Sequence, residues 1–386
     1  MLLNDAVTAI PGAPVIEAAS WIRKEPSNLS FINMSQAVPS YPPAPQLREE
    51  IARLALAEDT SGYTGVVGIE PLRAALAAAM GAHGGSVAED DVAITAGCNQ
   101  AFCVAASAVA RPGDNVILPV PWYFNHQMWL DMQRIELRPL GTDPATCMPD
   151  PAAAAALIDE RTRAIVLVTP NNPTGATYPP ALIEAFYDLA KARGIALIVD
   201  ETYRDYLAPE VPPHRLFDQP DWRQTLVQLY SFSKAYALAG YRVGSVIAGP
   251  EMIATVEKLL DCVTICAPKI AQGAALYGLK HLSKWKDEKR RLMDSRRAAL
   301  LEAFQRPDLR YTLLSSGAYF AYVRHPFGND PGVATALAKR LAHEQNMLVM
   351  PGEMFGPGQE SCLRLAFANV DGALMHEVAA RFVASQ

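Results

Sequence analysis

Residues 226–244 read LVQLYSFSKAYALAGYRVG: an apolar run typical of a buried strand, followed at once by a lysine beside small hydroxyl residues. Taken alone, Lys234 would be an ordinary surface lysine in a loop. Arg242 follows eight residues later, with a glycine on either side of it. Arginine beside serine hydroxyls makes charge-assisted contacts to anions. The spacing therefore predicts that Ser231, Ser233 and Arg242 hold an anionic group while Lys234 reaches the other end of the same small molecule.

Strand and helix patterns alternate around this stretch. The apolar runs at 164–169 and 195–200 do not alternate with polar residues, which is typical of strands buried on both faces. Their alternation with helices predicts an α/β fold with a mostly parallel sheet, where ligands bind at the carboxyl ends of the strands. The predicted strands are 92–95, 115–119, 164–169, 195–200, 226–231 and 243–248, and the predicted helices are 45–58, 70–80, 101–110 and 180–193.

The C-terminal third has a different pattern. A long polar helix is predicted over 283–304, because this stretch is rich in Lys, Arg and Glu. Beyond it, short strands at 319–323 and 363–367 accompany helices at 333–344 and 373–384, which indicates an α+β unit. We expect a large domain over 46–284 and a small domain formed by 1–45 and 285–386.

Two other strand ends carry polar residues. Asp200, the first residue of DETY, ends the strand predicted at 195–200. An aspartate at a strand end is often only a turn former, but a carboxylate beside a pyridine nitrogen keeps that nitrogen protonated and makes the ring an electron sink. Tyr203 lies three residues on, and Asn172 lies in the turn NNPTG at 171–175. Both side chains are able to donate a hydrogen bond to a phenolate oxygen on the same ring.

A helix N-terminus follows the strand at 92–95. Backbone N–H groups there form an anion site, and Gly97 lets the backbone approach the anion closely. Cys98 would lie at the same place, where the helix dipole favours the thiolate. A spectator role for this cysteine is nevertheless the favoured interpretation.

Composition excludes several classes of protein. The 386 residues are 50% hydrophobic and 19% charged, enough for a sizeable core, and the formal net charge of -6 comes without a basic stripe for nucleic acid. The six cysteines form no CxxC pair and no His lies at zinc-finger spacing, so free thiols and no metal are expected. The most apolar stretch is about half the ~20 residues of a membrane span. With no basic start of a signal peptide before Asp5, we expect a cytoplasmic protein without membrane contact.

In order and spacing, these segments resemble the class I/II aminotransferases of the aspartate aminotransferase superfamily, the fold-type I enzymes of pyridoxal 5'-phosphate (PLP). The resemblance rests on SFSK at 231–234 followed by Arg242, on DETY at 200–203 and on NNPTG, and it runs from about Asn33 to Phe367. It implies a mostly parallel seven-stranded sheet between helices, a smaller α+β domain, PLP as cofactor, an amino acid and a 2-keto acid as substrates, and a homodimer with shared active sites.

The resemblance also implies a role for each site residue. Lys234 would form the Schiff base (the aldimine) with PLP and carry the proton, Asp200 would pair with the pyridine nitrogen, and Arg364 would bind the substrate α-carboxylate. The remaining residues would contact the cofactor: Tyr203 and Asn172 at the phenolate oxygen, Gly97, Cys98, Asn99, Ser231, Ser233 and Arg242 around the phosphate, Tyr123 on the ring, and Tyr63 at the phosphate in the partner subunit.

One position departs from the family pattern. Ala37 stands where the family usually carries a glycine whose backbone helps to bind the substrate carboxylate. The methyl group of Ala37 is therefore expected to narrow the substrate site.

Rival functions stay open. A β-eliminating C–S lyase of the same fold usually carries DEIH where this chain has DETY, and a PLP-binding regulatory domain is a more remote alternative. A nicotinamide dehydrogenase is excluded because Gly62, Gly65 and Gly68 do not have GxGxxG spacing and no strand precedes them.

The substrate expected for an aminotransferase is a neutral, apolar or aromatic L-amino acid. Arg364 accounts for the α-carboxylate, and the matching segments hold no second cation for an acidic side chain. The candidate wall of the side-chain pocket is aromatic and comprises Trp122, Tyr123, Phe124, Tyr41 and Tyr319, although a core position is equally compatible with most of them.

Overall fold

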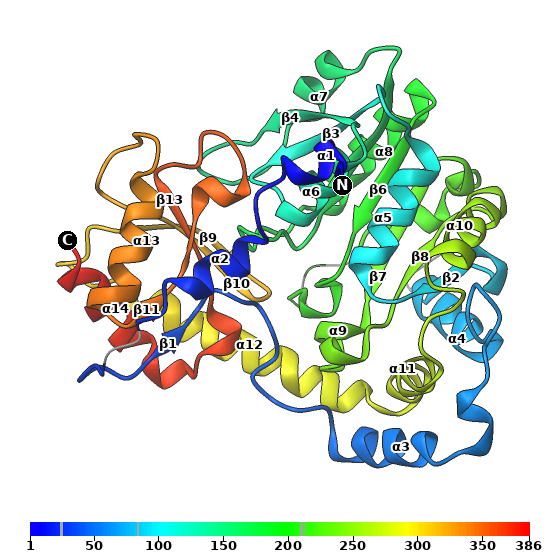
Figure 1. Cartoon of the computed structure of the whole chain (residues 1–386), viewed down its shortest axis with the longest axis horizontal. Coiled ribbons are helices and arrows are strands. Elements are labelled where there is room, and N and C mark those ends of the chain that lie inside the picture. Colours follow the sequence, from blue (N-terminus) through cyan, green and yellow to red (C-terminus); the bar gives the residue numbers. More distant parts are fainter. Residues whose placement is uncertain (24–25, 83–84, 209–210, 212) are drawn as a thin grey trace.

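A seven-stranded sheet forms the centre of the larger part of the molecule (Figure 1). The computed structural model describes residues 1–23, 26–82, 85–208, 211 and 213–386. The strand order is β2-β8-β7-β6-β5-β3-β4, and only β8 runs antiparallel to its neighbours. The strands are β2 (Val92–Thr95), β3 (Asn115–Val120), β4 (Glu136–Gly141), β5 (Thr162–Val168), β6 (Ala196–Asp200), β7 (Leu226–Ser231) and β8 (Gly244–Ile247).

Helices cover both faces of this sheet, which explains the continuous apolar runs. In β5, Ile165 and Leu167 face one core cluster, whereas Ala164 and Val166 face the other. Apolar residues at successive positions are therefore buried on opposite sides. The first cluster includes residues of α4 (Glu70–Gly81), α8 (Pro180–Arg193) and α11 (Lys269–His281), and the second includes residues of α5 (Cys98–Val109), α6 (Phe124–Met132) and α10 (Pro250–Val263).

A second unit contains a four-stranded antiparallel sheet of order β12-β13-β10-β9. Its strands are β9 (Thr312–Gly317), β10 (Phe320–Arg324), β12 (Met350–Pro351) and β13 (Cys362–Ala366), and its helices are α12 (Ser283–Ala303), α13 (Val333–Glu344) and α14 (Met375–Ala384). Figure 1 shows α12 running from this unit to the end of α11. Ala18, Trp21, Ile32 and Met34 from the N-terminal segment pack into the same core. The α/β architecture with a separate smaller sheet is thus confirmed.

Most predicted elements exist with ends shifted by a few residues, but some strands were missed. Only α8, α13, β2 and β7 have the predicted bounds, and the helix predicted to Glu58 ends earlier, as α3 (Pro45–Ala55). β4 was missed because it is an edge strand that contains Pro139 and is half exposed, so it lacks an apolar run. Also missed were β9, β12 and the two-residue pair β1 (Ile32–Asn33) and β11 (Met347–Leu348). The predicted domain boundaries stay a prediction.

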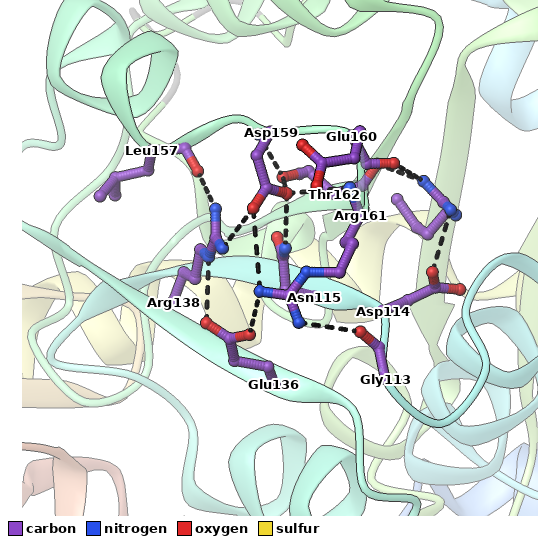
Figure 2. A network of polar contacts seen from close by, with 11 residues as sticks. Gly113, Asp114, Asn115, Glu136, Arg138, Leu157, Asp159, Glu160, Arg161 and Thr162 are labelled. Atoms are coloured by element: carbon purple, nitrogen blue, oxygen red, sulfur yellow. Dashed lines mark hydrogen bonds and ion pairs between the residues drawn. The ribbon is translucent and has the colours of Figure 1, made fainter.

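A polar network fixes the amino ends of β3, β4 and β5, opposite to the strand ends that carried the predicted site (Figure 2). Asp159 accepts hydrogen bonds from Asn115 Nδ2 at 2.9 Å and from Arg138 Nη2 at 2.6 Å. Arg138 and Arg161 both pair with Glu136 on β4. The network therefore ties the loop before β5 to β3 and β4 and lies apart from the predicted site.

The turn NNPTG brings the two units into backbone contact. Gly175 has a φ of +73°, and a Cβ on it would overlap the backbone of Gly317 at the end of β9. Only glycine meets both conditions, because it lacks Cβ and adopts positive φ readily.

We expect Gly175→Ala to lower the free energy of unfolding by roughly 2–4 kcal/mol, the sum of backbone strain and overpacking. Gly113→Ala is the matched control: Gly113 has a φ of +93° but nothing lies within 4 Å of an added Cβ. It should lose only the strain contribution, about 1 kcal/mol. Urea denaturation of both variants measures the difference. Equal losses would show that the backbone contact between the units is not tight.

Candidate active site

A hollow of about 380 Å³ lies at the carboxyl ends of the central strands and extends to the second unit. Twelve of the predicted site residues line it: Ala37, Cys98, Asn99, Tyr123, Asn172, Asp200, Tyr203, Ser231, Ser233, Lys234, Arg242 and Arg364. Apolar side chains from the N-terminal segment, Ala13 and Val15, also line the hollow, and the sequence had given no sign of them. The fold thus brings together residues that are up to several hundred positions apart.

Lys234 lies on α9 (Phe232–Ala235), a single helical turn directly after β7. The turn is capped by Ser231, whose hydroxyl accepts from the backbone N–H of Ser233 at 3.2 Å. The lysine Nζ donates to the backbone carbonyl of Ala37. Burial, followed by the charges of two nearby arginines, lowers the pKa of Lys234 to about 8. A significant share of the amine is therefore neutral near physiological pH, and a neutral amine is a nucleophile.

Asp200 ends β6 and is held by several donors. Its carboxylate accepts from the backbone N–H of Thr202 at 2.9 Å and lies 3.3 Å from His126 Nε2. Burial pushes the pKa of Asp200 upward, but the hydrogen bond and charge of His126 and the contacts with Thr202 outweigh it and hold the pKa below the usual value. A buried carboxylate is thus kept ionised where it faces the hollow.

His126 is a site residue that the sequence did not reveal. It lies in the first turn of α6, and its ring stacks on Phe102 of α5 at a centroid distance of 3.8 Å. The only signal in the sequence is its position three residues after Tyr123. Because its partner Asp200 is 74 residues away in the chain, no local pattern connects the two.

Cys98 is not activated by its position at the start of α5. Its Sγ lies 3.6 Å from Asp200 Oδ1, within the range of a weak S–H hydrogen bond. Burial, and then the negative charge of Asp200, raise the pKa of the Cys98 thiol well above its usual value. The helix dipole was expected to favour the thiolate, but desolvation wins, and the neutral thiol fits the spectator interpretation.

Gly97 and Arg242 lie against each other at the N-terminus of α5. Gly97 precedes α5 with a φ of +89°, and a Cβ at this position would overlap Arg242 Nη2. The guanidinium is held by the backbone carbonyls of Ala239 and Ala96, at 2.9 Å and 3.4 Å. Gly97 itself does not line the hollow; it makes space for the arginine that does. The helix N-terminus and the guanidinium together favour an anion here.

Arg364 forms a second cationic end of the hollow. It lies in the middle of β13, and only 2% of it is exposed. Its guanidinium donates to Asn172 Oδ1 at 3.1 Å and to the Ser35 carbonyl. The guanidinium carbon lies 5.1 Å from the ring centroid of Phe320 and 4.9 Å from that of Phe355. Burial lowers the pKa of Arg364 to about 10. Within the described ranges its Nε has no hydrogen-bond partner, and a buried guanidinium without a carboxylate is suited to an anionic ligand.

The predicted aromatic wall is only partly present. Tyr123 and Phe124 line the hollow, and Tyr123 Oη donates to Asn99 Oδ1 at 3.2 Å. Trp122 instead packs in the core, and Tyr41 and Tyr319 do not line the hollow, so the prediction is wrong for these three residues. Burial raises the pKa of Tyr123 to about 12, so its hydroxyl remains protonated and able to donate.

Tyr63 is not brought to the hollow. It precedes α4, and 79% of it is exposed.

No helix in the described part of the chain is long and apolar enough to cross a membrane.

Comparison with known proteins gives a consistent result. The family model "Aminotransferase class I and II" matches residues 30–382. The chain is 27% identical over 335 residues to an aspartate aminotransferase of Sulfurisphaera tokodaii, covering 85% of this chain and 82% of the relative. It is 28% identical over 378 residues to a valine–pyruvate aminotransferase of Mycobacterium tuberculosis, covering 96% of each. A mutant aspartate aminotransferase of Thermus thermophilus has the same fold, with a TM-score of 0.89, 25% identity and full coverage of both chains.

These matches confirm the resemblance found in the sequence and the fold-type I architecture. The family is generally PLP-dependent, and its members act on amino acids and keto acids. Because the family model spans most of the chain, the chain belongs to the class I and II aminotransferases and is a transaminase.

Proposed function

We propose that this transaminase uses PLP, held on Lys234, to transfer the amino group of a neutral L-amino acid to a 2-keto acid. The observation that carries the proposal is the arrangement of the hollow: a lysine amine with a lowered pKa lies between two separate cationic ends, formed by Arg242 and Arg364. One cationic end suits the cofactor phosphate and the other suits the substrate carboxylate.

The residues present fit PLP. The space that Gly97 leaves for Arg242, with Ser231 and Ser233 beside it, would hold the phosphate. Asp200 remains ionised when buried, as a partner for a protonated pyridine nitrogen must. Asn172 Oδ1 accepts a hydrogen bond from Arg364, so the N–H donors of the amide remain for the phenolate oxygen. The hydroxyl of Tyr203 would be a second donor to that oxygen. Tyr123 lines the hollow, where it would cover the ring.

The bound cofactor supplies an electron sink for the α-carbon of the amino acid. The amine of Lys234 takes the α-proton and returns it, which its lowered pKa allows near neutral pH. Arg364 orients the substrate through its carboxylate. His126 and the Thr202 N–H keep Asp200 charged and in place.

The charge of the lining supports a neutral substrate. Of the described residues that line the hollow, only Lys234, Arg242 and Arg364 are basic, and each has a role above. The remaining wall contains Ala13 and Val15 from the N-terminal segment. Among the described lining residues of this chain, a second carboxylate would meet no further cation. The relatives are named for substrates as different as aspartate and valine, so the lining is the better guide.

We also propose the two-domain division at 46–284 against 1–45 and 285–386, a cytoplasmic location and a homodimer. Separate core clusters in the two units support the division. The exposed ring of Tyr63 supports the dimer, in which it would reach the phosphate in the other subunit. A C–S lyase has no specific support from the site.

Reduction with borohydride tests the attachment of PLP. We expect the purified protein to be yellow and to carry the reduced cofactor on the peptide that contains Lys234, because this amine is held inside the hollow. Peptide mass spectrometry locates the label. Lys234→Arg, which keeps the charge but lacks the primary amine, should take up none. Label on another lysine would contradict the proposal.

A substrate panel tests the neutral side-chain pocket. With one keto acid fixed, kcat/KM should be higher for phenylalanine, methionine and leucine than for aspartate and arginine. The range among the neutral amino acids should be modest, because size discrimination in an apolar pocket amounts to ~1–3 kcal/mol.

The neutral-substrate proposal fails if aspartate or arginine exceeds every neutral amino acid by more than about tenfold, roughly the lower limit of such discrimination. Release of pyruvate from cystathionine, without any keto acid from the panel, would support the lyase.

A further inference from the structure

Three tyrosine hydroxyls lie close together beside the backbone of Lys234, outside the lining of the hollow. Tyr206 ends the short 3-10 helix that follows β6, Tyr319 lies between β9 and β10, and Tyr41 lies in the extended segment between β1 and α3. The oxygen of Tyr206 is 2.8 Å from that of Tyr319 and 3.2 Å from that of Tyr41, and the oxygens of Tyr41 and Tyr319 are 3.4 Å apart. We call these residues the three-tyrosine cluster.

The direction of the hydrogen bonds in the cluster follows from counting protons. Tyr206 donates its single proton to the backbone carbonyl of Lys234 at 2.8 Å. It must therefore accept in its contacts with Tyr319 and Tyr41. Burial raises the pKa of Tyr206 and of Tyr319 well above the usual value, so both remain protonated and able to donate. The chain of donors thus leads toward the Lys234 carbonyl.

The backbone of Lys234 needs such support. The helix α9 that carries it has four residues, and an isolated single turn is unstable because helix nucleation is unfavourable. Its start is fixed by the Ser231 cap, and Tyr206 holds the carbonyl near its end. The phenol therefore helps to set where the lysine side chain leaves the backbone.

The same cluster reaches the segment that covers the lysine. Lys234 Nζ donates to the carbonyl of Ala37, and Tyr41 lies four residues further along this segment. The second unit holds the segment as well: the Val38 N–H donates to Asn369, and Arg296 donates to Ser40. In Figure 1 this segment crosses from β1 toward α3. The tyrosines would thus transmit a movement of the second unit to α9.

We propose that Tyr206 is a positioning residue for Lys234, and that the three-tyrosine cluster couples the lysine to the segment 35–41 and to the turn between β9 and β10. The inference rests on the proposed role of Lys234, and the cluster acts on the lysine through its backbone, without touching cofactor or substrate. Its effect is to hold the amine where it meets the cofactor.

The variant Tyr206→Phe tests this, because it removes only the hydroxyl. In cofactor-free protein, hydrogen exchange of the backbone at 232–236 and 35–41 should become several-fold faster. Added PLP should attach to Lys234 about tenfold more slowly, the change expected for one lost hydrogen bond. The attachment joins the lysine amine to the aldehyde with loss of water, and it is monitored by the growth of the cofactor absorbance. A role limited to overall stability would lower the melting temperature without these two local changes.

Tyr311→Phe is the matched control. Tyr311 is also buried, and its hydroxyl pairs with Ser385 in the core of the second unit. Neither exchange at 232–236 nor the rate of PLP attachment should change in this variant.

Tyr41→Phe and Tyr319→Phe each remove one hydrogen-bond donor to Tyr206. They replace Tyr206→Phe as the test if that variant does not fold. Either should speed exchange at 232–236, and combining one of them with Tyr206→Phe should add little, because the hydroxyls act as one unit. Unchanged exchange and attachment rates in the tyrosine variants would overturn the proposal. Failure of the wild-type protein to attach PLP to Lys234 would instead contradict the proposed function. The exchange measurements would still decide whether the cluster positions α9.

Discussion

Three basic side chains, Lys234, Arg242 and Arg364, face one hollow, and within the described residues none forms a salt bridge with a carboxylate. Burial, and then the positive charges of the two arginines, disfavour protonation of the lysine amine, so the pKa of Lys234 falls to about 8. The arginines remain charged. The site therefore has one amine able to react and two positive ends able to bind anions, and this asymmetry determines what chemistry it can perform.

The fold explains how such an arrangement is assembled. Lys234 follows β7 and Arg242 lies just before β8 of the large sheet, whereas Arg364 lies in the small sheet. Two contacts join the two units that form the hollow. Asn172 in the large unit accepts a hydrogen bond from Arg364 in the second, and Gly175 allows backbone contact with Gly317. The segment carrying Ala37 is bound to both units and accepts from the lysine amine. The distance between the cationic ends thus depends on the packing of the two units.

Sequence reasoning identified the residues at strand ends, because buried strands followed by polar turns are visible locally. Lys234, Asp200 and Asn172 were found this way, and Arg242 was found by its spacing from Lys234. The resemblance added Arg364, which alone is an ordinary strand arginine. Sequence reasoning could not find His126, Ala13, Val15 or the role of Tyr206, because their contacts join segments far apart in the chain. It also placed Tyr41 and Tyr319 at the pocket wall, since an aromatic side chain gives no local sign of which side of a loop it faces.

The pKa of the Lys234 amine is the most direct test of this account. It can be measured in cofactor-free protein from the pH dependence of labelling by fluorodinitrobenzene, with the Lys234 peptide quantified by mass spectrometry. We expect half-maximal labelling near pH 8, and a higher midpoint in Arg364→Gln, where one neighbouring positive charge is removed. A midpoint near the ordinary lysine value of about 10.4 in both proteins would contradict the claim that burial and the two arginines make this amine reactive.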